Sequence, residues 1–150
     1  IVVSAGAKAI LDLPKTVELL ETLGVVVLGY ETNEFPAFYS RSSGVYGIHS
    51  VNKTIDIANI YNKNKSGGLP CGTLVVNPIP KSKEIPVIQL NNIIQIAYEK
   101  ASRHNIEGKK LTPFLLNEIS EKTIGKSLEA NKALALNNIK LGAKIAKNLS

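Results

Sequence analysis

The sequence contains a single cysteine, Cys71, and has no methionine and no tryptophan among its 150 residues. One cysteine excludes a disulfide within the chain, and the absence of a nearby histidine in the sequence argues against a catalytic thiol. No apolar run reaches the roughly 18 residues of a membrane span, and no targeting peptide is visible. We therefore expect a non-membrane protein of the cytoplasm, or of an organelle if the source is a eukaryote.

Aromatic residues are also scarce, at 5% of the chain, whereas hydrophobic residues make up 44%. This composition excludes a disordered tail and fits an aliphatic α/β core. The chain carries a net charge of +6, from 18 basic and 12 acidic residues. Because the basic residues are dispersed along the chain, we expect them to form a solvated surface that attracts an anionic small substrate, and not a nucleic-acid interface.

The start of the chain has the pattern of a strand–helix–strand unit. Apolar strands are expected over 1–5 (IVVSA) and 25–30 (VVVLGY), and Asp12 is suited to cap a helix that Pro14 begins and Gly24 ends. Such a unit predicts two parallel, neighbouring strands. Because the chain begins with an isoleucine inside a strand and has no methionine, we interpret it as a piece of a longer protein.

The rest of the chain alternates loops with helices and one further strand. Ser50, Thr112 and Ser127 are expected to cap helices, and the apolar residues of the last helix suggest burial on more than one face. The order predicts an α/β fold: a layered α/β/α domain with a mostly parallel sheet, here a partial domain. The expected elements are a loop over 31–44, helices over 51–61, 87–103, 113–122 and 128–149, and a strand over 73–80.

Lys8 stands in the turn after the first predicted strand, where packing alone gives no reason for a charge. Ligands of parallel α/β sheets bind beyond the carboxyl ends of the strands, and the small residues 5–7 would let a ligand approach the backbone. A lysine amine partly removed from water at such a place can attack a sugar aldehyde and form a Schiff base. A surface lysine or a phosphate-binding charge is the alternative.

Asparagines supply the next candidates. Asn131 falls in the first turn of the last predicted helix, and Asn138 falls on the same face two turns later. Amides among aliphatic residues need hydrogen-bond partners, so they could orient hydroxyl groups or water, or could serve only in capping and packing. Asn77, at the end of a strand, leaves the same alternatives open. The segment SRSSG (40–44) offers hydroxyls and an arginine that suit a phosphate.

Five segments carry a resemblance to a known family. Each alone is weak, but together and in this order they resemble the pseudouridine-5'-phosphate glycosidases over nearly the whole chain. The resemblance implies an enzyme, a lyase or glycosidase, that reversibly cleaves the C–C glycosidic bond of pseudouridine 5'-phosphate to uracil and ribose 5-phosphate. The segments are AGAKAILDLPKTVELLETLGV, GYETNEFPAFYSRSSG, LVVNPIP, LTPFLLNEI and KSLEANKALALNNIKLGAKIA.

The resemblance also implies roles for two residues. The family's lysine in AGAK falls on Lys8 and would attack the anomeric carbon of the sugar, and the family's active-site asparagine falls on Asn131. Lys132 departs from the family pattern, which usually has an aliphatic residue there. A non-catalytic domain that binds a phosphosugar or nucleotide is the alternative hypothesis.

The resemblance further implies parts that this sequence does not hold. It makes residues 1–150 the C-terminal part of a single glycosidase domain, and it places upstream the acid carboxylate, a second lysine and the aspartate that holds a divalent metal, typically Mn²⁺. His49 and His104 are isolated, and no residues here have the spacing of a metal site. The implied partners are the small-molecule substrates and other copies in a homo-oligomer, commonly a trimer, with no nucleic acid and no membrane.

Overall fold

Four parallel strands form one sheet in the computed structural model, which describes residues 1–69 and 71–149. The strands follow the order β1-β4-β2-β3 across the sheet. Pro70 and Ser150, the last residue of the expected domain, lie outside the described residues. The strands are β1 (Val2–Ser4), β2 (Val26–Tyr30), β3 (His49–Val51) and β4 (Thr73–Val76).

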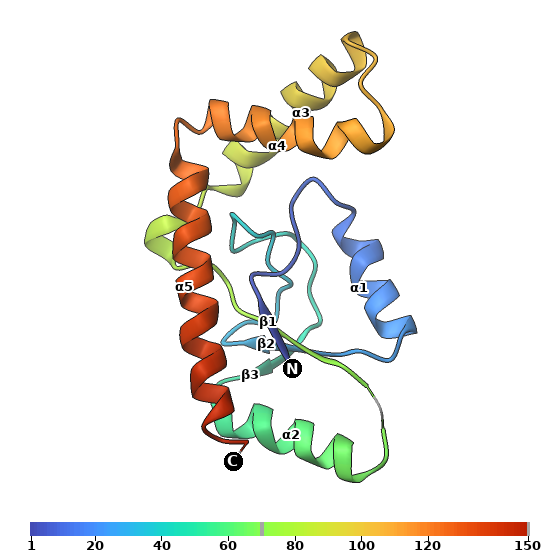
Figure 1. Cartoon of the computed structure of the whole chain (residues 1–150), viewed down its shortest axis with the longest axis vertical. Helices are drawn as coiled ribbons and strands as arrows, with labels where there is room; N and C mark the ends of the chain where they lie inside the picture. The colour runs from blue at the N-terminus through green and yellow to red at the C-terminus, as the bar shows by residue number, and fades with distance from the viewer. Residues whose placement is uncertain (70, 150) are drawn as a thin grey trace.

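The helices surround the sheet and extend beyond it. Figure 1 shows α3 and α4 beyond the carboxyl ends of the strands, and α5 running from them along the sheet to α2. None of the helices in the described part of the chain is long and apolar enough to cross a bilayer. The helices are α1 (Leu13–Thr22), α2 (Thr54–Ser66), α3 (Val87–Arg103), α4 (Leu111–Lys122) and α5 (Lys126–Ala146), with short 3₁₀ helices η1 (Lys81–Lys83) and η2 (Gly108–Lys110).

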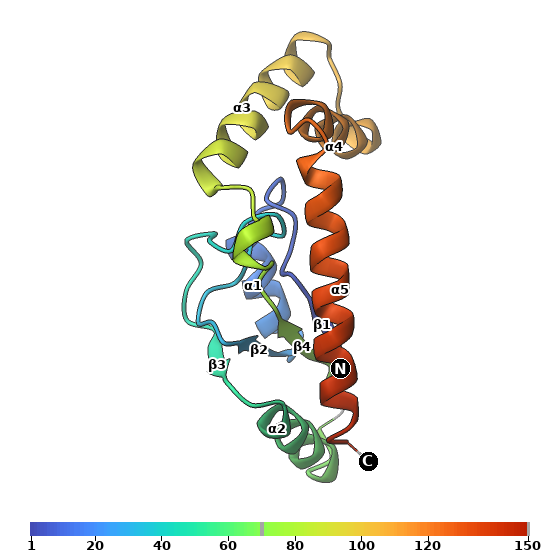
Figure 2. The same ribbon diagram turned by 90° about the vertical axis from the view of Figure 1, so that its left-hand side faces the viewer.

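The predicted α/β/α layers are confirmed by how β4 is covered. Successive side chains of a strand point to opposite faces of the sheet. Val76 packs with Val17 of α1 on one face. Val75 packs with Ile57 of α2 and Leu141 of α5 on the other, and the second view shows α5 beside the sheet (Figure 2).

The first strand–helix–strand unit is confirmed except for its strand order. Asp12 caps α1, because its carboxylate accepts a hydrogen bond of 3.1 Å from the backbone N–H of Lys15. β1 and β2 are parallel, but they are not neighbours, since both pair with β4 between them. Val75 and Val76 are fully buried, and a strand that is apolar on both faces suits the centre of a parallel sheet.

Three predicted helix caps are wrong. Ser50 lies in β3, where it pairs with Gly29 of β2, so strand pairing at the sheet edge displaces the helix start to Thr54. Thr112 lies inside α4, because η2 leads directly into that helix. Ser127 lies inside α5, and its backbone N–H donates to the hydroxyl of Thr123 at 3.3 Å. Thr123 therefore supplies the capping contact expected of Ser127.

Two other predictions fail at the edges of the core. The strand predicted over 73–80, with Pro78 and Pro80 closing it, ends earlier, at Val76; as expected, the two prolines have no N–H to donate to a ladder. The last helix buries one face and not several: Leu141 is 4% exposed, whereas Ile139 is 67% exposed. The sheet and the remaining helices cover α5 from one side only, and the other side faces solvent.

Candidate active site

The turn that carries Lys8 is held against the loop that follows β2. Gly6 has a φ of +78°, and a Cβ atom there would lie 1.9 Å from the carbonyl oxygen of Pro36. Only glycine fits this close approach without displacing the backbone. Next to it, the N–H of Phe38 donates to the carbonyl of Ala5 at 3.1 Å. The two loops therefore fix each other at the carboxyl end of β1.

The residues after Lys8 anchor the same turn from the other side. The N–H of Leu11 donates to the carbonyl of Lys8 at 2.9 Å, and the hydroxyl of Tyr98 on α3 donates to the carbonyl of Ile10 at 3.1 Å. Lys8 is half-buried, and its amine has no hydrogen-bond or ion-pair partner within residues 1–69 and 71–149. The backbone is thus fixed while the amine stays available.

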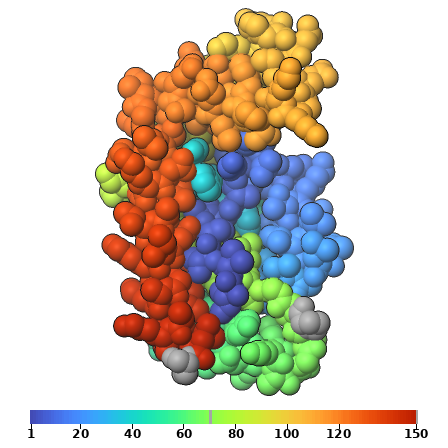
Figure 3. Space-filling view, in the orientation of Figure 1, coloured from blue at the N-terminus to red at the C-terminus, as the bar shows by residue number. Residues whose placement is uncertain are grey.

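Lys8 and Asn131, the two residues predicted to act in catalysis, line the same cavity. The cavity has a volume of about 370 Å³, and α5 brings Asn131 to it. Figure 3 shows the loop after β2 (cyan) between the N-terminal segment (blue) and α5 (orange-red). The lining consists of Lys8, Phe38, Tyr39, Leu116, Ser120, Ser127, Leu128 and Asn131.

Tyr39 is the cavity residue that sequence reasoning missed. Its hydroxyl oxygen accepts a hydrogen bond of 3.1 Å from the Asn131 side-chain amide. Burial raises the pKa of the Tyr39 hydroxyl and outweighs the hydrogen bond from Asn131, which lowers it, so the tyrosine stays protonated. The available signal was an aromatic cluster, FPAFY, inside an otherwise polar loop.

The other two asparagines do not reach the cavity. The Asn77 amide donates to the Asn138 side-chain oxygen at 3.1 Å, and the Asn137 amide beside it donates to the carbonyl of Pro78 at 3.1 Å. These bonds tie the middle of α5 to the end of β4. Asn138 and Asn77 therefore satisfy each other in the core, as the packing alternative predicts.

The SRSSG segment holds a carboxylate of the protein itself. One oxygen of Glu34 accepts hydrogen bonds from the Ser42 hydroxyl at 2.8 Å and from the backbone N–H groups of Ser43 at 2.6 Å and Gly44 at 2.7 Å. The Arg41 guanidinium donates to the carbonyl of Ile79 at 2.8 Å. The groups that suited a phosphate are thus already engaged.

Glu34 is accordingly held in its charged form. Burial raises the pKa of its carboxyl, but the hydrogen bonds from Gly44, Ser43 and Ser42 outweigh this effect, so that the pKa lies below its ordinary value of 4.5. A carboxylate that accepts several N–H and O–H groups is stabilised as the anion. Glu34 therefore serves as a loop anchor and not as a proton donor.

Metal ligands are not gathered in the described residues. No group of three or more His, Cys, Asp or Glu there could hold a metal ion, and the cavity lining described above contains no acidic side chain. The buried carboxylate of Glu118 is already paired with Lys100. These residues do not fit a divalent cation.

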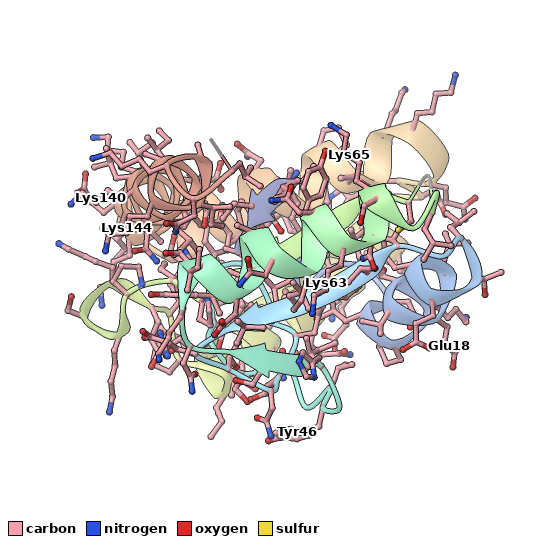
Figure 4. The ribbon with its side chains drawn as sticks, turned by 90° about the horizontal axis from the view of Figure 1, so that it is seen from below. Glu18, Tyr46, Lys63, Lys65, Lys140 and Lys144 are labelled. Atoms are coloured by element: carbon pink, nitrogen blue, oxygen red, sulfur yellow. The ribbon has the colours of Figure 1, made fainter. Side chains whose placement is uncertain are left out.

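Basic side chains lie on several elements of the structure. Figure 4 shows Lys140 and Lys144 on α5, apart from Lys63 and Lys65 on α2. His49 is exposed on β3, and the ring of His104 contacts the carbonyl of Lys100 at 2.8 Å. The two histidines thus lie on separate elements, away from the lining of the Lys8 cavity.

The family model described as "Indigoidine synthase A like protein" matches residues 1–148 of the chain. The chain belongs to this family. Within it, the chain is 50% identical over 145 residues to a pseudouridine-5'-phosphate glycosidase of Legionella pneumophila, covering 97% of this chain and 46% of the relative. It is 48% identical over 149 residues to one of Caldanaerobacter subterraneus, covering 99% of this chain and 48% of the relative.

Two solved structures contain this fold over about half of their own chains. The prealnumycin C-glycosynthase AlnA, in complex with ribulose 5-phosphate, superposes with a TM-score of 0.92 at 26% identity, covering 97% of this chain and 48% of that one. An indigoidine synthase A-like protein from Thermotoga maritima superposes with a TM-score of 0.82 at 38% identity, covering 96% and 47%. The chain spans about half the length of the curated relatives it matches.

Proposed function

We propose that the chain supplies the nucleophilic lysine and the substrate-orienting asparagine of a pseudouridine-5'-phosphate glycosidase. The reaction is the reversible cleavage of the C–C bond between C1' of the ribose and C5 of uracil. The observation that carries the proposal is that Lys8 and Asn131, far apart in the sequence, line one cavity. It is supported by relatives of that name at 46–50% identity, and by a C-glycosynthase of the same fold with a bound phosphosugar.

The bond to be broken explains why a lysine suits this cavity. A C-nucleoside has no heteroatom leaving group at C1', so that a pair of carboxylates acting on a glycosidic oxygen does not fit the substrate. If the C1'–O4' bond opens and O4' takes a proton, C1' becomes electrophilic. The free amine of Lys8 then bonds to C1' and loses a proton.

Release of the base follows from the new C–N bond. A proton adds to C5 of uracil, the C1'–C5 bond breaks, and its electron pair restores the C5–C6 double bond of the base. The nitrogen lone pair of Lys8 forms the C=N bond of an iminium with the sugar. Water then adds to C1', and the C–N bond breaks to return the amine and ribose 5-phosphate.

The remaining groups are assigned by the chemistry they can do. The Asn131 amide is neutral, so its part is to orient a sugar hydroxyl or the attacking water. The lining of the cavity has no carboxylate, so we expect residues outside this sequence to donate the proton. Residues outside this sequence would also hold the divalent metal, Mn²⁺. A trimeric homo-oligomer remains part of the proposal.

Trapping of the iminium tests the proposal. The intact protein is incubated with ribose 5-phosphate and borohydride, which reduces the imine to a stable amine. Mass spectrometry of the peptides is expected to show one reduced pentose phosphate on Lys8, and none in a Lys8→Arg variant. Lys15→Arg, on an exposed lysine paired with Asp12, is the matched control and should still be labelled at Lys8. An adduct elsewhere, or none in an active protein, would reject the proposal.

A non-catalytic phosphosugar-binding domain is the second candidate. It is favoured by one observation: the described residues bring no proton-donating carboxylate to the Lys8 cavity. Calorimetry on the intact protein separates the two. Binding of ribose 5-phosphate without any release of uracil from pseudouridine 5'-phosphate would support the binding domain, whereas turnover would exclude it.

A further inference from the structure

Tyr39 is placed to control the direction in which the Asn131 amide faces. The Asn131 nitrogen is the atom that donates to the Tyr39 hydroxyl, at 3.1 Å. An amide that commits its N–H₂ group to one partner turns its carbonyl oxygen the other way. No group among residues 1–69 and 71–149 donates to that Asn131 oxygen. The oxygen is therefore free to accept a hydrogen bond.

Tyr39 itself is held in place by its surroundings. The residue is 8% exposed, and it belongs to the core cluster that also contains Ala130 and Leu134 of α5. The ring of Phe38 packs edge-on against it with a centroid distance of 5.0 Å, and the carbonyl of Tyr39 accepts from the N–H of Ile85 at 2.8 Å. A side chain fixed in this way can fix the orientation of its partner.

We propose that Tyr39 is a positioning residue of the reaction, which aims the oxygen of Asn131 into the Lys8 cavity as a hydrogen-bond acceptor for an O–H group. That group is a hydroxyl of the ring-opened sugar or the water that hydrolyses the imine. The inference rests on the proposed function. It adds to that function a residue that acts through Asn131 and does not touch the reacting atoms.

A double-mutant cycle on the intact protein tests this role. Tyr39→Phe removes only the hydroxyl and is expected to lower kcat for uracil release by about 10-fold to 100-fold, with KM changed by less than about 2-fold, since ground-state binding is kept. Tyr46→Phe, the same change at a side chain that is 66% exposed, should leave kcat unchanged. Far-UV circular dichroism and urea unfolding test whether each variant keeps its fold.

The decisive readout is non-additivity. Because Tyr39 acts only through Asn131, the Tyr39→Phe/Asn131→Ala double variant is expected to be within about 2-fold of Asn131→Ala alone. An unchanged kcat in Tyr39→Phe, or a double variant whose loss equals the product of the two single losses, would overturn the positioning role. If Tyr39→Phe fails to fold, Tyr39→Met takes its place: it fills the same core position without a hydroxyl group, and a wild-type kcat would overturn the role equally.

Failure of this inference can be told apart from failure of the proposed function. The Lys8 adduct with ribose 5-phosphate should form in the wild-type protein whatever Tyr39 does. If the adduct forms and Tyr39→Phe has full activity, only the role of Tyr39 is wrong. If no adduct forms in an active wild-type protein, the proposed function itself is wrong.

Discussion

Two neighbouring regions at the carboxyl edge of the sheet use polar side chains in opposite ways. Around Glu34, the hydroxyl of Ser42 and the N–H groups of Ser43 and Gly44 all point at one carboxylate oxygen. In the cavity, the amine of Lys8 and the oxygen of Asn131 have no partner within the described residues. The saturated region, around Glu34, stabilises a loop, whereas the open region, the Lys8 cavity, can receive a ligand. Unused hydrogen-bonding capacity, and not polarity, distinguishes the candidate active site.

The contact between Gly6 and Pro36 joins the two regions. Disturbing this contact is expected to give the largest loss of stability. Gly6→Ala places a Cβ in contact with the carbonyl of Pro36 at a positive φ and should lower the free energy of unfolding by about 3 kcal/mol. Gly24→Ala is the matched control, because Gly24 has a φ of +68° with no atom within 4 Å of its Cβ position. It should cost about 1 kcal/mol. Equal losses by urea unfolding would show that the contact with Pro36 is not tight.

Removal of the charge in the saturated region should have the next largest effect. Glu34→Gln keeps the shape but weakens three hydrogen bonds to a carboxylate, and we expect a loss of about 2 kcal/mol at pH 7. Because the pKa of Glu34 in the folded protein lies below its ordinary 4.5, its contribution is complete above that value and is lost as the pH falls through the folded pKa. Urea unfolding of both proteins between pH 7 and 3 measures this. A difference in the free energy of unfolding between the two proteins that grows on acidification would contradict the anchoring role.

The smallest effect is expected from a single donor to that carboxylate. Ser42→Ala removes the hydrogen bond of 2.8 Å to Glu34 and should cost about 1 kcal/mol, while labelling of Lys8 by ribose 5-phosphate and borohydride is retained. Ser66→Ala, which removes an exposed hydroxyl bond to the carbonyl of Lys63, should cost less. A loss of Lys8 labelling in Ser42→Ala would show that the two regions are not separate in function.

Local patterns sufficed for the parts of the fold that depend on neighbouring residues. Asp12 before Pro14 predicted the start of α1 correctly, and the helix predicted over 87–103 matches α3 (Val87–Arg103). The layers followed from the order of strands and helices. Such features depend on short-range geometry, which a sequence displays directly.

Several of the features that the sequence did not predict depend on contacts between distant segments. The pairing of β3 with β2 placed Ser50 in a strand and not at a helix start. The partner of Asn131 is Tyr39, a residue from another loop, and no periodic pattern in the sequence joins them. In the sequence, Glu34 looks like an ordinary loop residue, because its contacts with the SRSSG segment form only in the folded chain.

The release of uracil from pseudouridine 5'-phosphate by a Lys8→Arg variant of the intact protein tests the central claim most directly. Arginine keeps the positive charge and the length of the side chain but cannot form the imine. We predict that kcat/KM falls by at least about 1,000-fold, with no trapped adduct and an unchanged circular dichroism spectrum. Release of uracil at the wild-type rate would contradict the account.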